Sequence, residues 1–265
     1  MPVVLANQSL VVSASADSTI IIWDANSWQY LGKYTGHTQA VESLEYLDSD
    51  SYSLMVSGSL DNTIQLWNIS TKVSSFQWNV SEHGAAWSLK AIPNSAQVAS
   101  GHNDGKILIW SVSEGINPSQ VLSGHSDVVF DLKIIENNRL ASASWDSNII
   151  IWNLNGYSLI KTLKGHNNKV FTLLPLIYDP YSILLSASAD DTVIMWNLKN
   201  LTKLFQYTSN TAGIYRALEL YNSKIFLSGS KMDDTLRAWS ISGREVIFSQ
   251  NIGLNITTVA VANRE

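Results

Sequence analysis

Residues 142–152 read SASWDSNIIIW. Apart from Trp145, the first half consists of small and polar residues, which tolerate a sharp chain reversal, and the second half contains β-branched isoleucines, which suit a pleated strand. The stretch therefore predicts a tight turn followed by a strand that ends at Trp152. Closely similar stretches end in a tryptophan at Trp23, Trp67, Trp110, Trp152, Trp196 and Trp239.

The six copies form a regular repeat, with successive tryptophans 42–44 residues apart. An aspartate lies six residues before each tryptophan, at Asp17, Asp61, Asp104, Asp146, Asp190 and Asp233. A serine lies ten residues before it in five copies, at Ser13, Ser57, Ser100, Ser142 and Ser186, and eleven before it in the last copy, at Ser228. Self-similarity at such a period is the signature of a repeat architecture.

Each repeat has room for four strands. In the fourth copy, apolar runs at 129–135 and 159–163 flank the central hairpin. No stretch has a convincing helical period, so the sequence predicts an all-β chain.

Two dipeptides accompany this repeat: Gly-His at Gly36-His37, Gly124-His125 and Gly165-His166, and Trp-Asp at Trp23-Asp24. In this combination the chain resembles the WD-repeat (WD40) family of β-propellers. The resemblance covers almost the whole chain. It implies a single domain over residues 1–265, built from four-stranded antiparallel blades.

The ends of the chain bear on how such a ring closes. The chain starts with a short apolar run, Val3 to Leu5, and the run Ile256 to Ala262 aligns with the first strand of a next repeat. We favour six blades, closed when this C-terminal strand pairs with the N-terminal hairpin, although the two runs compete for one place. The alternative is a seven-bladed ring, of which this chain is a fragment or a shortened member.

Composition narrows the function classes. The 265 residues are 45% hydrophobic and 15% charged, include no cysteine and carry a net charge of −5. These values predict a folded protein without disulfides, and the net negative charge argues against nucleic acid as a partner. The sequence has no run of about 18 apolar residues and no signal-peptide pattern at its start, so we expect a cytoplasmic or nuclear protein and no membrane partner. No phosphate-binding loop, dinucleotide fingerprint or metal-ligand motif occurs, so we expect no cofactor and no metal.

Four copies combine histidine, serine, aspartate and tryptophan. The sets are His37, Ser57, Asp61 and Trp67; His83, Ser100, Asp104 and Trp110; His125, Ser142, Asp146 and Trp152; and His166, Ser186, Asp190 and Trp196. A hydrolase needs one such triad in one cleft, whereas here the set recurs in register. The resemblance implies structural tetrads whose buried polar groups bond in series, and therefore no catalytic residue.

The second set departs from the pattern. Glu82 stands where glycine is expected before His83, and the following loop is one residue short. The remaining histidine, His102, occupies the place of the second serine of a Ser-x-Ser motif and is interpreted as a local strand-end variant.

The resemblance also implies where a partner binds: on the top face, beside the first apolar position of each inner strand and just before each turn aspartate. The residues that this register gives are Trp87, Phe130, Trp145, Phe171, Tyr215, Leu60, Met232 and Glu42. Lys169 is added to them as the second charged residue of this face. Aromatic and large apolar side chains dominate interface hot spots. Several arginines, which a phosphopeptide receptor would need, are absent from these positions.

We therefore expect a non-catalytic scaffold within a multiprotein complex, which binds an apolar or aromatic-bearing peptide or protein segment on this face. The alternative is a regulatory or substrate-recognition fragment of a larger signalling or ubiquitin-ligase protein. A propeller hydrolase is the third reading, and the surface residues supply no convergent carboxylates for it.

Overall fold

The computed structural model describes residues 2–5, 9–49, 52–69, 71, 73–112, 116–178, 181–208, 214–219, 224–230 and 234–253. The chain divides into two compact units, Met1–Leu132 and Lys133–Glu265. Every helix or strand assigned in the described residues is a β-strand, so the all-β prediction is confirmed.

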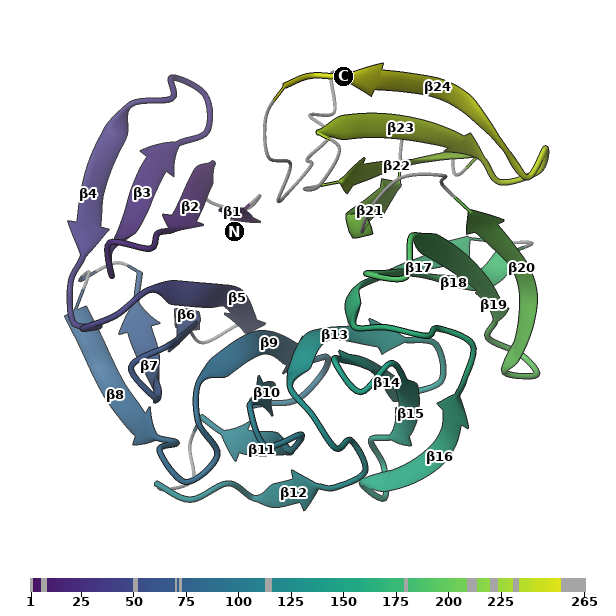
Figure 1. Cartoon of the computed structure of the whole chain (residues 1–265). Helices are drawn as coiled ribbons and strands as arrows, with labels where there is room; N and C mark the ends of the chain where they lie inside the picture. The colour runs from purple at the N-terminus through teal and green to yellow at the C-terminus, as the bar shows by residue number, and fades with distance from the viewer. Residues whose placement is uncertain are drawn as a thin grey trace. The chain divides into compact units, whose positions relative to one another are not determined.

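The first unit holds three four-stranded antiparallel sheets (Figure 1). One sheet consists of β1 (Pro2–Leu5), β2 (Leu10–Ala14), β3 (Ile20–Asp24) and β4 (Tyr30–Tyr34). The next consists of β5 (Val41–Ser49), β6 (Tyr52–Ser59), β7 (Thr63–Asn68) and β8 (Val73–Asn79). The third consists of β9 (Ala86–Ile92), β10 (Gln97–His102), β11 (Ile107–Ser111) and β12 (Gln120–Leu122).

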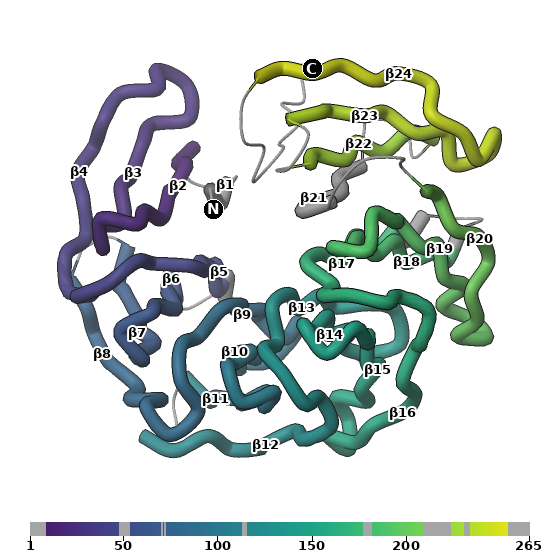
Figure 2. Tube along the Cα trace, viewed as in Figure 1, coloured from purple at the N-terminus to yellow at the C-terminus, as the bar shows by residue number. Residues whose placement is uncertain are grey.

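Three more four-stranded sheets follow, the first of which begins in the last residues of the first unit. It consists of β13 (Val129–Ile135), β14 (Arg139–Ser144), β15 (Ile149–Asn153) and β16 (Ser158–Leu163). The next consists of β17 (Val170–Tyr178), β18 (Tyr181–Ser188), β19 (Thr192–Asn197) and β20 (Thr202–Thr208). The last consists of β21 (Ile214–Glu219), β22 (Ile225–Ser230), β23 (Thr235–Ser240) and β24 (Glu245–Asn251). Within each sheet the chain runs from one edge to the other in sequence order (Figure 2).

A residue with a positive φ recurs between the second and third strands of all six sheets. The residue after each turn aspartate has a positive φ, at Ser18, Asn62, Gly105, Ser147, Asp191 and Asp234. In five of these turns an oxygen of the aspartate accepts the backbone N–H two residues on, at 2.9–3.1 Å. The aspartate thus satisfies a donor that the sharp reversal leaves without a ladder partner, which explains why the turn needs this residue type.

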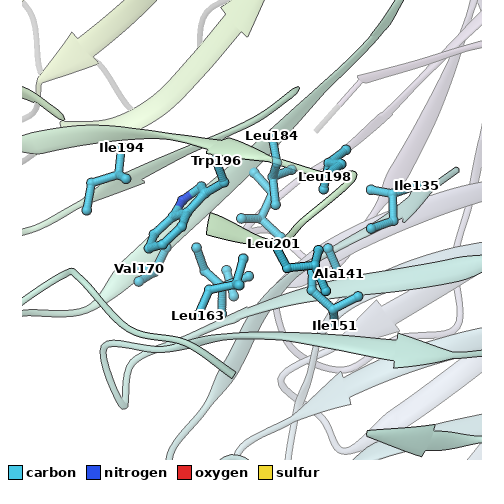
Figure 3. Packing of buried hydrophobic residues seen from close by; sticks show 13 residues of the cluster. Ile135, Ala141, Ile151, Leu163, Val170, Leu184, Ile194, Trp196, Leu198 and Leu201 are labelled. Atoms are coloured by element: carbon cyan, nitrogen blue, oxygen red, sulfur yellow. The ribbon is translucent and has the colours of Figure 1, made fainter. Parts of the chain in front are cut away.

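Neighbouring sheets pack through their apolar faces. In the second unit, Leu163 of β16 and Trp196 of β19 belong to one buried cluster, and Figure 3 shows the Trp196 ring beside Val170 and Leu163. In the first unit, Val56 of β6 and Trp110 of β11 share another cluster. Each of these side chains is almost fully removed from water, a burial that contributes about 1.5–3 kcal/mol for a large apolar residue.

The first sheet departs from the expected route of ring closure. The place beside β2 is taken by β1, with Val3 opposite Val12 and Leu5 opposite Leu10. Of the two runs that compete for this place, the N-terminal one occupies it, because it lies only a short loop away from its partner strand. Pairing of a C-terminal strand with the N-terminal hairpin is therefore not found, and residues 256–262 lie outside the described residues.

Candidate functional site

Four of the inner-strand residues predicted to meet a partner occupy β-bulges. Val41 pairs with Ser59 and Ser43 with Gly58, so Glu42 is the extra residue on its strand. The same shift of register leaves three more residues without a partner opposite them on the next strand, namely Trp87 on β9, Phe171 on β17 and Tyr215 on β21. A bulge breaks the alternation of side chains across a sheet and re-aims the extra one. The fold therefore sets these positions apart from the strand around them.

The first unit brings two predicted residues into contact. The rings of Trp87 and Phe130 lie 5.6 Å apart between centroids at 32°, close to offset stacking. The Trp87 indole Nε1–H donates to Oδ1 of Asn103, the residue after β10. Both rings are half-buried, so this stacked pair presents a partly exposed apolar surface.

The second unit pairs Trp145 with Lys169, whose Nζ lies 3.7 Å from the centroid of the indole ring. This cation–π geometry holds the lysine over a face that would otherwise be more exposed. Phe171, by contrast, is only 7% exposed, which makes it mainly a packing residue.

The other predicted contact residues contribute less. Leu60 and Glu42 are half-buried at the same end of their sheet. The side chain of Tyr215 and the whole of Met232 lie outside the described residues.

Polar bonds in series join the first of the predicted sets. His37 Nδ1–H donates to Asp61 Oδ2 at 2.9 Å, because a carboxylate can only accept. His37 Nε2 then accepts from the Ser57 hydroxyl at 2.7 Å, and Ser57 Oγ accepts from Trp67 Nε1–H at 2.7 Å. The fourth set repeats this chain of bonds through His166, with 3.0, 2.7 and 2.8 Å.

The electrostatics of these sets suit a structural role. Burial alone would raise the pKa of Asp61, but hydrogen bonds from Thr63, the Thr38 N–H and His37 outweigh it and hold the pKa below its usual range. The pKa of Asp190 is likewise lowered, by His166, Thr192 and the Asn167 N–H acting against burial. Burial lowers the pKa of His37, against the pull of Asp61. A serine whose oxygen already accepts from a buried indole is held in the fold and is poorly placed to attack a substrate.

The tryptophan–serine half of the pattern extends to all six sheets. The indole N–H donates to the serine hydroxyl oxygen at 2.7–3.0 Å in Trp23–Ser13, Trp67–Ser57, Trp110–Ser100, Trp152–Ser142, Trp196–Ser186 and Trp239–Ser228. In the third set, the Trp152–Ser142 bond and the turn hydrogen bond of Asp146 both lie in the second unit. His125 lies in the first unit, where it is buried.

The second set corrects the sequence prediction. His83 donates to Asp104 Oδ2 at 2.8 Å, but Ser100 is bonded to His102 instead, whose Nε2 lies 2.7 Å from its Oγ. His102 Nδ1–H donates to the carbonyl of Gly84 at 3.2 Å. Elsewhere this bond to the loop carbonyl comes from the second serine, as from Ser59 to Gln39. His102 is therefore an integral part of the set and carries the contacts of two residues.

The glycine before the histidine explains why this sheet differs. A Cβ at Gly36 would lie 2.9 Å from the Trp67 ring, and one at Gly165 would lie 3.0 Å from the Trp196 ring. Glu82 has a Cβ at the corresponding position, and the His83 side chain is 25% exposed where that of His37 is fully buried. The buried place beside Ser100 is occupied by His102.

Sequence reasoning missed the roles of His102 and Asn103. The signal in the sequence was that three deviations occur in the same repeat: the missing glycine, the shortened loop and the histidine in place of serine. Pattern matching treats these as separate deviations, although together they describe one rearranged corner.

Among the described residues, no group of three or more histidine or acidic side chains could hold a metal ion. Nor does that part of the chain contain a helix long and apolar enough to cross a membrane.

The repeats match a family model described as WD domain, G-beta repeat, over residues 4–24, 28–68, 74–111, 116–153 and 157–197. These segments cover more than half of the chain. The chain belongs to the WD40 family. The four-stranded sheets described above are thus consistent with the blades of a WD40 propeller, and the sixth repeat, outside the matched segments, keeps the same tryptophan–serine bond. A comparison with curated proteins found no match.

Proposed function

We propose that this WD40 protein is a non-catalytic interaction module that binds an apolar or aromatic-bearing segment of a partner protein at the bulged ends of its inner strands. WD40 repeats generally mediate protein–protein interaction, which gives the class of function. The stacked pair of Trp87 and Phe130 is the single observation that carries the finer assignment.

Three features support this location. The bulges re-aim Glu42 and Trp87, a distortion that packing within a sheet does not require. Tryptophan and phenylalanine supply a large contact area, and half-buried rings keep part of it available. In the second unit, Lys169 over the Trp145 ring is a separate candidate contact that combines an aromatic face with a positive charge.

The repeated Ser-His-Asp sets do not support the competing proposal of a hydrolase. In the first and fourth sets the serine oxygen accepts from an indole and the hydroxyl is directed at the imidazole, all in buried surroundings. A reactive set would need an accessible nucleophile beside an oxyanion site.

An affinity capture from cell extract tests the proposal. The bait is the wild-type chain, the double variant Trp87→Ala/Phe130→Ala, and a matched control, Trp28→Ala/Tyr30→Ala, which removes two aromatics that are 68% and 57% exposed next to or on β4. Phe171 is left intact because its burial would turn the test into one of stability. We expect partners captured by the wild type and the control to be lost by the double variant, provided that all three melt alike. Equal capture by all three would contradict the proposal.

A further inference from the structure

The rearranged corner of the third sheet differs from the first and fourth sets in one chemical respect. His37 and His166 each use both ring nitrogens inside their set. His83 uses only Nδ1, for Asp104, because His102 has taken Ser100. Among the described residues, no group is hydrogen-bonded to His83 Nε2. The His83 and Asp104 side chains are 25% and 34% exposed, so this nitrogen belongs to a partly exposed pair.

The hydrogen-bonding role of His83 Nε2 follows from its neighbour. Since the Asp104 carboxylate can only accept, the proton of the neutral imidazole lies on Nδ1, and Nε2 carries a lone pair. The corner thus offers a hydrogen-bond acceptor.

Asn103 supplies the complementary donor. Trp87 Nε1–H donates to its Oδ1, which fixes the orientation of the carboxamide and leaves the Nδ2 hydrogens for another acceptor. No described residue accepts from Nδ2. A Cβ on Gly84 would lie 2.8 Å from Asn103 Cβ and 3.0 Å from Nδ2, so the carboxamide lies against the residue that follows His83. The Asp104 N–H also donates to the His83 carbonyl at 3.4 Å, which ties the two segments together.

An apolar surface adjoins these two groups. Trp87 is bonded to Asn103 and stacks on Phe130, so one residue links the polar pair to the aromatic pair. In an extended peptide, the N–H and C=O of one residue point to the same side of the chain, and side chains alternate between the two faces. The C=O, the N–H and an apolar side chain of such a peptide can therefore bind together to the donor, the acceptor and the aromatic surface of this corner.

We propose that this corner binds an extended peptide segment of a partner protein, through the backbone N–H of one residue to His83 Nε2 and its C=O to Asn103 Nδ2, with a large apolar side chain covering Trp87 and Phe130. The inference rests on the proposed function and makes it specific. It assigns recognition to main-chain geometry and apolar bulk at one sheet, whereas the corresponding position in the second sheet, Leu60, offers no such polar group.

Peptides chosen without bias test the assignment. A library of random linear twelve-residue peptides is selected on the wild-type chain, and the selected peptides are synthesised with and without a methyl group on each backbone nitrogen in turn. Their dissociation constants are measured by calorimetry against the wild type and four variants. Asn103→Asp keeps an acceptor for Trp87 but removes the donor, and His83→Asn keeps a donor for Asp104 but removes the Nε2 acceptor. Trp87→Ala/Phe130→Ala removes the rings. Asn94→Asp, at the other end of the same sheet, is the matched control for added charge.

We expect Asn103→Asp and His83→Asn each to weaken binding about 3- to 10-fold, as for one neutral hydrogen bond. The double ring variant should weaken it at least about 30-fold, while Asn94→Asp leaves it unchanged. At one peptide position, N-methylation should weaken binding to the wild type but not to His83→Asn, because the N–H at that position donates to His83 Nε2. Binding that depends on the rings but not on Asn103 or His83 would overturn this inference and leave the proposed function standing. Peptides that ignore the rings as well, or no peptide that prefers the wild type over the ring variant, would contradict both.

Discussion

At the scale of single residues, the molecule shows how one exchange redistributes several hydrogen bonds. Where other sheets have a second serine, the third has His102, which bonds both Ser100 and the Gly84 carbonyl. The resemblance to the WD-repeat family implied which residue types meet in the first and fourth sets, and the hydrogen bonds of His37 and His166 agree with it. It was wrong about His83 and Ser100, since the outcome depends on whether a Cβ fits against a tryptophan ring, a contact that spacing does not encode.

Replacing His102 with serine tests its burial through the pH dependence of stability. Burial lowers the pKa of His102 to about 4, with the Gly84 carbonyl and Asp104 opposing the shift and His83 adding to it. Between this value and about 6.5, the unfolded chain binds more protons than the folded one, so stability falls as the pH falls. Urea unfolding at pH 7 and pH 5 should show the wild type losing about 2 kcal/mol more than His102→Ser between the two conditions. An equal loss in both proteins would contradict the placement of His102.

A matched pair of alanine variants tests the sets themselves. His37→Ala removes a buried imidazole and leaves Asp61 and Ser57 short of a partner, at a cost of roughly 1–3 kcal/mol. His83→Ala removes a partly exposed ring with one hydrogen bond, so its cost should be clearly smaller. Thermal unfolding of the two variants under the same conditions measures the difference. A larger loss for His83→Ala would reverse the roles assigned here.

At the scale of strands and turns, the sequence predicted the hairpins well and the bulges not at all. β-branched runs and turn aspartates are local signals, so strands such as β15 could be located from composition. A bulge arises from the register between two strands, as where Trp87 has no partner opposite it on β10. No residue type at that position encodes it, which is why the geometry around the predicted contact residues required the structure.

Gly58 tests how closely neighbouring sheets approach. Ser43 Oγ–H donates to the Ala86 carbonyl at 3.3 Å, and a Cβ on Gly58 would lie 2.6 Å from that hydroxyl oxygen and 2.8 Å from that carbonyl. Gly58→Ala should therefore destabilise the protein by about 1–3 kcal/mol through overpacking. Gly156→Ala is the control, since the nearest atom to its Cβ would lie 3.9 Å away. Surface substitutions without structural effect usually change stability by about 0.5 kcal/mol or less. A difference between the two variants smaller than about 0.5 kcal/mol in urea unfolding would therefore show that the sheets can adjust.

At the scale of the whole molecule, the regular repeat predicted the family and the four-stranded sheets, and both are confirmed. The sequence analysis was wrong about the strand that completes the first sheet, which it expected to come from the C-terminal run 256–262. Two short apolar runs of similar character competed for that place, and β1 occupies it. The choice depends on chain connectivity and pairing, which apolar composition alone does not distinguish.

The central claim is that partners bind at the surface formed by Trp87 and Phe130, and that the repeated Ser-His-Asp sets only support the fold. The chain has ten tryptophans, six of which donate their indole N–H to a serine. Nuclear magnetic resonance spectra of the indole N–H groups, assigned by single Trp→Phe variants, are recorded with and without a partner recovered by the capture experiment. We predict that the Trp87 signal shifts or broadens while the six serine-bonded signals stay in place. A bound partner that moves the serine-bonded signals and leaves that of Trp87 unchanged would contradict the account.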